Sequence, residues 1–509
     1  MFKKQTVFQA SVIILITTFL SRIIGFVREI IIANIFGASV EYDTYLIAVT
    51  FPLIIYSISL YALPSGFIPL YVEEKITKNK ESSNRFFLNF INVFSLIFFL
   101  LFLGLYFFSP HIIKLYFQST DNLNIQYAVK VLKYVSIIVF FGGIFAILRS
   151  YLNANKHFIL PAFAPLILNL VVIFFIYAFS ENLSTFSIAI GLITGYFIQF
   201  FILFIYVFFR KTKYKFYINI KDSQLKKVFY ILISIIILET IGQLYVVIDR
   251  AFNFLLPVGA ISALNYANII YLIPISIFGI AIGTAIFPTV SELVLNKNYD
   301  GLNKFCEKSI KTLVIISIPI VFLFLSYSRE FVIVLFQRGE FDNYATKLTS
   351  ESLVFLSIGL GFLVIHAILI KIFYALRNIK ELFFTSILAI ILKIIISMVL
   401  VKNYFHIGLA LATSIAGFVN VVLMYGILSN KLNGLNHKSI ISTFLKVIII
   451  CSISTFVLRF LIVIHINSSV LLNLIVQLLI WISIFIILVF LIRIKEIEDF
   501  FVKIKSKIR

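Results

Sequence analysis

The chain has 509 residues, of which 61% are hydrophobic and only 13% are charged, and its mean hydropathy is +1.08. Soluble proteins are about 45 to 50% apolar and about 25% charged, so this composition excludes a soluble enzyme or binding module and indicates an integral membrane protein. The net charge of +21 could suggest a nucleic-acid-binding protein. Most basic residues, however, lie in short polar segments between apolar runs. This placement fits a membrane protein with both termini in the cytoplasm, and we expect no nucleic-acid partner.

Apolar runs of helix length recur along the whole chain. About 14 of them have roughly 18 or more residues, which is enough to cross a bilayer as an α-helix. They begin near Gln9, Tyr42, Phe86, Val129, Leu160, Thr185, Leu225, Ser262, Ile310, Ala345, Leu382, Ile407, Ile441 and Val470. An outer-membrane barrel would show alternating segments of about ten residues instead. The sequence therefore predicts an all-α polytopic membrane protein with about 14 transmembrane helices.

The first run, residues 7–37, carries the charged side chains of Arg22, Arg28 and Glu29. A charge near the bilayer centre costs about 2.5 to 3.5 kcal/mol on insertion scales, so three in one span need a paired or hydrated environment. On a helix Arg22 and Glu29 share a face, about two turns apart, and Arg28 points about 120° away from Arg22. Two interpretations remain open. The charges pair with neighbouring helices, or the arginines face a water-filled cavity and bind an anion such as a phosphate.

Other charges also fall within or beside apolar runs. Asp43 begins the second run, where it could cap a helix or stand at the interface. Asp249 and Arg250 fall near the middle of the predicted seventh span. There Asp249 could pair with an arginine of the first span or bind a coupling cation. Four basic residues stand alone near the ends of runs, and we expect their side chains to snorkel to the interface: Arg149, Lys371, Lys393 and Arg459.

The two halves of the chain share features about 220 residues apart. A charged span is followed by a turn containing Gly37 in one half and Gly259 in the other, and residues 151–155 resemble residues 374–378. The alternative is a chance resemblance between apolar sequences. Two lobes of six helices would insert in the same orientation and form a parallel pseudo-twofold repeat, with the substrate between them. The predicted parts are an N-terminal lobe (1–220), a C-terminal lobe (221–435), and two extra helices with a basic cytoplasmic tail (436–509).

The largest basic cluster lies between the sixth and seventh spans. It consists of Arg210, Lys211, Lys213, Lys215, Lys221, Lys226 and Lys227. Positive-inside topology accounts for this cluster, and the alternative is a bound acidic partner or anionic lipid headgroup.

Sequence motifs for cofactor chemistry are absent. The chain has no phosphate-binding loop, no dinucleotide fingerprint and no zinc-like histidine pair. Cys306 and Cys451 are isolated, so neither a disulfide framework nor a metal site is predicted. We therefore expect no enzyme and no cofactor. A transporter with this sequence would be driven by Na⁺, H⁺ or the membrane potential.

Residues 21–29, the turn at Gly37 and Asp43 resemble the MurJ (MviN) family of lipid II flippases, within the multidrug/oligosaccharidyl-lipid/polysaccharide (MOP) exporter superfamily. Further similarity lies in residues 152–158, 161–165, 262–267, 278–284, 335–342 and 406–414. The resemblance implies 14 helices in two lobes and alternating access to a cationic cavity. Such a cavity would carry an undecaprenyl-diphosphate-linked glycan outward, as part of peptidoglycan and cell wall synthesis.

The resemblance also implies roles for single residues. Arg22 and Arg28 occupy the arginine positions of the family's first span, Glu29 replaces the usual aspartate, and Asp43 matches an acidic residue. These four residues would bind the substrate.

The chain departs from the family at other positions. The family's arginine pair in the second span falls on Tyr56 and Ser57, and residues 266–269 read Tyr-Ala-Asn-Ile where the family has Tyr-Ala-Asp-Arg. Asp249 stands where some members have a sodium-linked carboxylate, and Arg250 supplies a cation that could replace a lost arginine.

The sequence thus predicts a monomeric flippase of lipid II in the bacterial cytoplasmic membrane. The alternatives are a flippase for another lipid-linked polysaccharide unit, a multidrug or cation antiporter of the same superfamily, and a membrane scaffold without transport activity.

Overall fold

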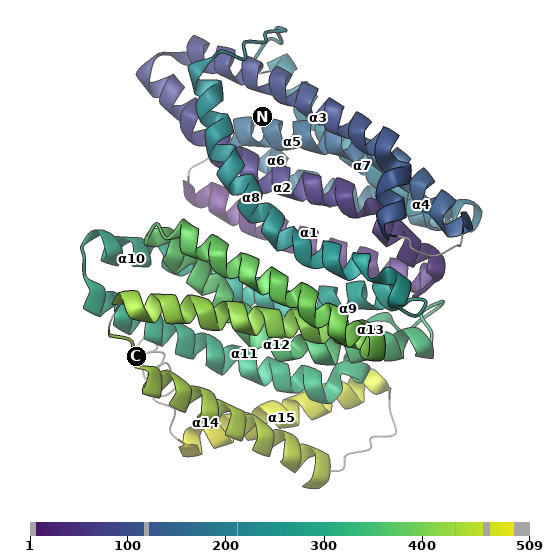
Figure 1. Ribbon diagram of the computed structural model, residues 1–509, viewed down its shortest axis with the longest axis vertical. Helices are drawn as coiled ribbons and strands as arrows, with labels where there is room; N and C mark the ends of the chain where they lie inside the picture. Colours follow the sequence, from purple (N-terminus) through teal and green to yellow (C-terminus); the bar gives the residue numbers. More distant parts are fainter. Residues whose placement is uncertain (1–6, 117–121, 211, 433, 462–468, 493–509) are drawn as a thin grey trace. The chain divides into compact units, whose positions relative to one another are not determined.

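The computed structural model describes residues 7–116, 122–210, 212–432, 434–461 and 469–492, and the basic tail predicted at 493–509 lies outside them. All regular secondary structure in these ranges is helical (Figure 1). The chain divides into two compact units, Met1–Phe254 and Leu255–Arg509. The all-α prediction is therefore confirmed.

The first unit contains eight α-helices in its described part. They are α1 (Val7–Phe36), α2 (Val40–Thr77), α3 (Lys80–Tyr116), α4 (Asn122–Val135), α5 (Ile137–Ala154), α6 (Ile159–Leu183), α7 (Phe186–Arg210) and α8 (Ser223–Ala251). Helix α6 packs on α1 and α7, and α2 packs on α5 and α8. The core is rich in aromatic rings, such as those of Phe67, Phe90 and Phe145, which are fully buried. Burial of such large apolar side chains holds neighbouring helices together.

The second unit contains the remaining helices. They are α9 (Ala260–Pro274), the π-helical η2 (Ile275–Ile280), α10 (Ala281–Leu295), α11 (Tyr299–Phe336), α12 (Asn343–Ala375), α13 (Ile379–Leu432), α14 (His437–Phe456), the π-helical η3 (Val457–Leu461) and α15 (Val470–Ile492). Helix α12 lies against α9, α11 and α13, and α11 lies against α14 and α15. The wider π-helical turn of η2 directly follows Pro274, whose ring nitrogen cannot donate a backbone hydrogen bond.

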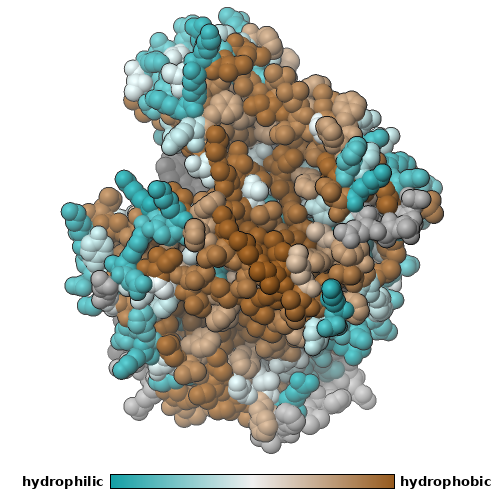
Figure 2. Space-filling model, in the orientation of Figure 1, coloured by the Kyte–Doolittle hydropathy of each residue, from teal (hydrophilic) through white to brown (hydrophobic). Residues whose placement is uncertain are grey.

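Twelve of the described helical stretches are long and apolar enough to cross a membrane. Helix α1 is not among them, and its described part holds three charged residues. Helix α13 counts once, although it consists of two helices that meet at a kink at Phe405. With α1 and both parts of α13 included, the helices agree with the predicted number of about 14. On the face in Figure 2, hydrophobic side chains cover the middle of the helices and hydrophilic ones gather toward the margins.

The two units repeat the same unusual backbone turns about 220 residues apart. The pairs with positive φ are Gly37 and Gly259, Lys156 and Arg377, and Ser184 and Phe405. Lys156 N donates to Asn153 O at 3.0 Å, and Arg377 N donates to Tyr374 O at 3.1 Å. These bonds close the ends of α5 and α12 in the same way. The recurrence supports the predicted internal repeat.

The boundary between the two compact units falls after α8, whereas the sequence suggested a lobe boundary before it. Leu225, Val228 and Leu232 of α8 join the aromatic core of the first unit. They can do so because Gly66 of α2 has no side chain, and a Cβ atom there would lie 2.8 Å from the Cδ2 atom of Leu232. The predicted lobe limits stay a prediction.

Candidate functional site

Arg28 of α1 is held by two partners in the first unit. Its guanidinium forms an ion pair with Glu29, and Nη1 donates a hydrogen bond of 2.9 Å to Oδ1 of Asn169 on α6. Asn169 in turn donates to the backbone oxygen of Ser21 at 3.3 Å. The side chains of Arg28 and Glu29 are 22% and 13% exposed. Arg28 is paired, as the first interpretation of the charged span requires, and its side chain is partly exposed, as binding of an anion requires. Both interpretations therefore remain open.

This pair retains unused hydrogen-bonding capacity. Within the described part of the chain, Nε of Arg28 and Oε2 of Glu29 are buried atoms that have no hydrogen-bond partner. A buried donor without a partner is costly, so such a group favours binding of an acceptor. Nε of Arg28 is thus suited to an anionic oxygen.

A second arginine lies beside acidic residues of the same unit. Arg250 is 8% exposed, and Asp43 and Asp249 are the carboxylates that interact with it electrostatically. Tyr42 interacts electrostatically with both Arg28 and Arg250 and so connects the two arginines. The structure therefore brings five of the predicted site residues into one charged cluster: Arg28, Glu29, Asp43, Asp249 and Arg250.

One expectation about this cluster is wrong, and one of the two alternatives for Asp43 is excluded. Asp249 and Arg250 lie in the last turn of α8 rather than near the middle of a span, because α8 ends at Ala251 while apolar residues continue the run to Leu256. Asp43 does not cap α2, because the side chain of Ser39 accepts the hydrogen bond from Tyr42 N at 3.2 Å.

Arg22 lies apart from this cluster, in a cavity of about 220 Å³ between α1, α5 and α6. The cavity also receives Arg149 and Asn153 of α5, one helical turn apart. Its complete lining is Thr18, Ser21, Arg22, Arg149, Asn153, Phe158, Pro161, Ala162 and Pro165. Two guanidinium groups and an amide make this cavity suitable for an anion.

The predicted snorkelling of two basic residues is corrected by the structure. Arg149 lines the cavity with Arg22, and Lys393 of α13 is 0% exposed within the second unit. Position in an apolar run does not reveal which face of a helix the neighbours cover. Arg149 and Asn169 are therefore the functional candidates that sequence reasoning missed. The only signal in the sequence was that each of them is a polar residue within an otherwise apolar helix.

Tyr56 and Ser57 stand where the family has two arginines, and their ring and hydrogen-bond contacts are with neutral side chains. The ring of Tyr56 packs edge-on against Tyr196 with centroids 4.7 Å apart, and Tyr56 interacts electrostatically with Arg149. Gln243 of α8 donates to the hydroxyl of Ser57 at 3.4 Å. A cation that interacts with this position thus comes from α5 rather than from α2 itself.

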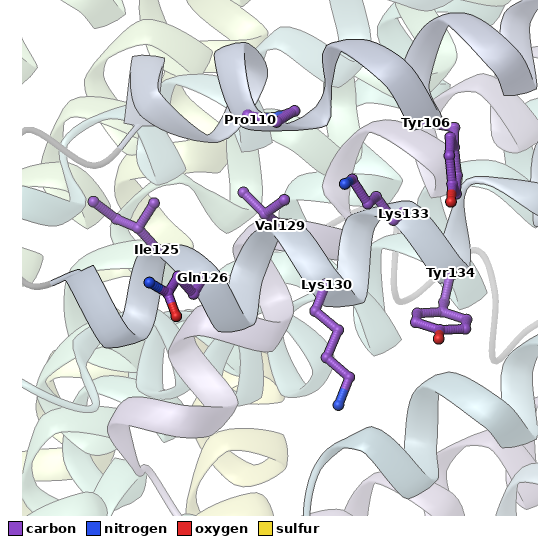
Figure 3. A pocket seen from close by; sticks show the side chains of 8 residues that line it. All are labelled: Tyr106, Pro110, Ile125, Gln126, Val129, Lys130, Lys133 and Tyr134. Carbon is purple, nitrogen blue, oxygen red and sulfur yellow. The ribbon is translucent and has the colours of Figure 1, made fainter.

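A separate cavity of about 550 Å³ lies between α3 and α4 and contains none of the predicted site residues (Figure 3). The ammonium of Lys133 lies 5.7 Å from the ring of Tyr106, and that of Lys130 lies 5.0 Å from the ring of Phe186. Among the described residues, no three histidine, cysteine, aspartate or glutamate side chains are placed to hold a metal ion.

Comparisons with known proteins agree with this architecture. The sequence model of the family described as "Lipid II flippase MurJ" matches residues 32–485. A probable lipid II flippase MurJ of Borreliella burgdorferi is 31% identical over 450 residues, which cover 86% of this chain and 87% of the relative. The corresponding protein of Rickettsia prowazekii is 30% identical over 461 residues, with 88% of each chain covered.

Comparison with solved structures also finds a MurJ protein. A lipid II flippase MurJ in an inward closed conformation matches with a TM-score of 0.81 and 28% identity, over 94% of this chain and 98% of that one. A multidrug MATE transporter of the MOP superfamily matches with a TM-score of 0.69 at 12% identity, covering 81% of this chain and 94% of its own, which shows a shared fold alone. The chain is thus a multi-span membrane protein and belongs to the MurJ family of lipid II flippases.

Proposed function

We propose that this protein is a flippase that moves lipid II from the inner to the outer leaflet of the bacterial cytoplasmic membrane by alternating access. The observation that carries the proposal is the charged cluster of Arg28, Glu29, Asp43, Asp249 and Arg250 in a chain of the MurJ family. A diphosphate is the strongest anion of such a glycan lipid, and planar guanidinium groups match its oxygens.

In this proposal the two arginine sites bind different anionic groups of the substrate. Nε of Arg28 donates a hydrogen bond to a phosphate oxygen, and Arg250 offers a second cation beside Asp43 and Asp249. Arg22 and Arg149 bind a further anionic group of the headgroup in the cavity between α1, α5 and α6. The polyprenyl tail stays in the bilayer, where its transfer into water would be unfavourable.

No chemical step is part of this proposal, so the protein acts as a transporter and not as an enzyme. The cycle is coupled to Na⁺, H⁺ or the membrane potential, with Asp249 as the candidate ion-coupling group. We further propose that both termini lie in the cytoplasm, that the protein acts as a monomer, and that it binds no nucleic acid.

The test replaces Arg28 by alanine in a strain depleted of its own lipid II flippase. We expect the Arg28→Ala variant to be present in the membrane but to lose lipid II translocation, measured by accessibility of lipid II at the outer surface. Arg329→Ala on the exposed side of α11 is the matched control and should keep full activity. Full activity of the Arg28 variant would contradict the proposed role.

A second candidate cargo is another lipid-linked polysaccharide unit, and the neutral contacts of Tyr56 and Ser57 favour it. In that case the wild-type protein would fail to support growth of the flippase-depleted strain. Native mass spectrometry of the purified protein would then detect a different glycan lipid. Cation-coupled efflux of small amphipathic compounds, with no effect on glycan lipids, would point to an antiporter instead.

A further inference from the structure

Residues 212–222, between α7 and α8, form an extended segment that is fixed to α3 by two asparagines. Asn89 donates to the backbone oxygen of Asn219 at 2.9 Å and accepts from its backbone nitrogen at 2.7 Å, as a neighbouring strand would. Asn92 donates to the backbone oxygens of Tyr217 at 3.1 Å and Lys215 at 3.3 Å. These bonds involve side chains that are 0% and 7% exposed, so the inner edge of the segment is firmly held.

Further contacts fix the ends of the segment. The hydroxyls of Thr212 and Tyr151 share a hydrogen bond of 2.7 Å, and the hydroxyl of Tyr214 donates to Asn92 at 2.7 Å. Burial raises the pKa of the Tyr214 phenol, which keeps it a donor at neutral pH. At the other end, Asp222 caps α8 by accepting from the backbone nitrogens of Gln224 and Leu225.

The opposite face of the segment is apolar and exposed. Because side chains of an extended chain alternate, the residues between those bonded to α3 point away from it. Phe216 is 78% exposed, Ile218 is 38% exposed and Ile220 is 67% exposed. Contiguous exposed apolar side chains on a well-ordered segment indicate a surface that is covered in the functional environment.

Basic side chains surround this apolar face. Lys213, Lys215 and Lys221 are exposed within the segment, and Lys226 and Lys227 are exposed on the first turns of α8. The single acidic residue in the segment is the helix cap Asp222. We call Phe216, Ile218 and Ile220 with Lys213, Lys215 and Lys221 the basic apolar edge.

The position of the basic apolar edge relative to the candidate membrane spans indicates which molecules cover it. Both α7 and α8 are candidate membrane spans, so the segment joining them lies at a membrane surface. Figure 1 shows this stretch beside α3 at the start of α8, and its partners Asn89 and Asn92 lie about two and a half and three helical turns after the start of α3 at Lys80. Helix α3 has 37 residues and is about 55 Å long, so its ends extend beyond the hydrocarbon core of about 30 Å. The segment beside its first turns therefore lies in the interfacial region, where apolar side chains meet acyl chains and lysines meet phosphates.

We propose that the basic apolar edge binds the anionic phospholipids of the adjacent leaflet. Phe216, Ile218 and Ile220 enter the boundary between headgroups and acyl chains, and the three lysines bind lipid phosphates. A membrane surface suits this edge better than an acidic protein, because exposed apolar and basic side chains lie together along one short segment that joins two candidate spans. The edge would fix the depth of the connection between α7 and α8, whichever lipid the protein carries.

The test measures the depth of a spin label at position 218 in the full-length protein. Cys306 and Cys451 are both buried and would be replaced by alanine before introducing Ile218→Cys. In liposomes containing phosphatidylglycerol, we expect the label to be relaxed by oxygen more than by a water-soluble nickel complex. Glu81→Cys, at the exposed start of α3, is the matched control and should respond to the nickel complex.

Two further variants separate the charges from the apolar contact. Replacing Lys213, Lys215 and Lys221 by glutamine should lower the ratio of inserted to water-exposed label by about fivefold for each lysine near the surface. In liposomes of phosphatidylcholine alone, the parent protein should show a similar decrease. Phe216→Ser should expose the label at position 218 in both membranes while the lysines remain.

Contrary outcomes are equally clear. A label that reacts with the nickel complex in every membrane would overturn the proposal, and so would a label shielded only after addition of a cytosolic protein. Because these readouts need no transport, loss of flippase activity would leave the result unchanged.

Discussion

The orientation of Arg28 depends on Asn169. The amide connects Nη1 of Arg28 with the backbone of Ser21, so one side chain of α6 fixes both the guanidinium and the middle of α1. Gly25 lies against the same amide, and a Cβ atom there would make an ordinary van der Waals contact, 3.5 Å from Nδ2 of Asn169. The pairing of Arg28 with Glu29 alone would not set the direction of its remaining donor.

We therefore expect Asn169→Leu to lower lipid II translocation by about 10- to 100-fold, because a hydrogen bond to a charged group contributes about 1.5 to 3 kcal/mol. Lipid II accessibility at the outer surface is the measurement. The adjacent Leu170→Ala is the control, since Leu170 is 54% exposed and should tolerate truncation. Equal activity of both variants would remove Asn169 from the site.

Arg149 offers a second prediction for a single residue. Arg149→Gln should weaken binding of the anionic headgroup by about tenfold or more, because the cavity then keeps one guanidinium, and Arg149→Lys should retain part of the affinity. Binding of purified lipid II at low and high salt would be measured. Lys130→Gln, which removes a lysine from the cavity between α3 and α4, should leave binding unchanged. A similar decrease in both variants would indicate a general effect of net charge.

Energetic reasoning from the sequence identified Arg28 and Glu29, because charges in an apolar run must be paired or hydrated. It could not identify Arg149 or Asn169. A lone polar residue on a helix has several physical explanations, and only the packing of α1 against α6 selects one. The same argument explains Lys393, whose burial depends on helices distant in sequence.

At the level of the elements, α5 packs closely against α2 and α3 because it has two adjacent glycines. A Cβ atom on Gly142 would lie 2.5 Å from the ring of Tyr56, and one on Gly143 would lie 2.4 Å from the ring of Phe98. No real Cβ contact is that short, so the rings would have to move.

Gly143→Ala is therefore expected to destabilise the protein by about 1 to 3 kcal/mol through overpacking. The control is Gly104→Ala in α3, where no atom lies within 4 Å of an added Cβ. That substitution should stabilise the helix by up to about 1 kcal/mol, because alanine has the higher helix propensity. Thermal unfolding in detergent would reveal the difference in sign, and a loss of stability in both variants would contradict this account.

Apolar run length predicts where the helices lie, because each must span the same hydrocarbon thickness. It does not predict how they end. The α-helix ends at Ala251 although the run continues through the short 3-10 helix Asn253–Leu255, and the kink at Phe405 falls in a run without proline or glycine at that position. Both features depend on tertiary contacts that override local preference.

At the scale of the whole molecule, Lys156 and Arg377 provide a matched pair of turns. Their φ angles are 61° and 59°, in a region that non-glycine residues occupy at a cost of about 1 kcal/mol. A β-branched residue fits that region worst. Lys156→Val and Arg377→Val should each lower the stability by about 1 to 2 kcal/mol, whereas glycine at either position should be at least neutral. Thermal unfolding of the four variants is the measurement, and unequal effects at the two positions would argue against equivalent turns.

The recurrence of glycine turns in the sequence predicted this repeat, because a turn that needs positive φ favours glycine. The pairs formed by Lys156 with Arg377 and Ser184 with Phe405 were not recognisable as turns of this kind, since none of them is glycine. The placement of α8 in the first unit was likewise not predictable. Its apolar residues match any neighbouring helix, and only Gly66 specifies the contact with α2.

The fixing of residues 212–222 to α3 also has a consequence for how the protein is made. The contacts of this segment described above are with Asn89, Asn92 and Tyr151, which leave the ribosome earlier. The segment can therefore be bound to α3 as soon as it is synthesised. At about 5 to 20 residues per second, translation of Leu255–Arg509 takes a further ten seconds or more. The first unit thus has time to assemble in the membrane before the second is complete, which reduces the chance that homologous helices of the two units pair wrongly.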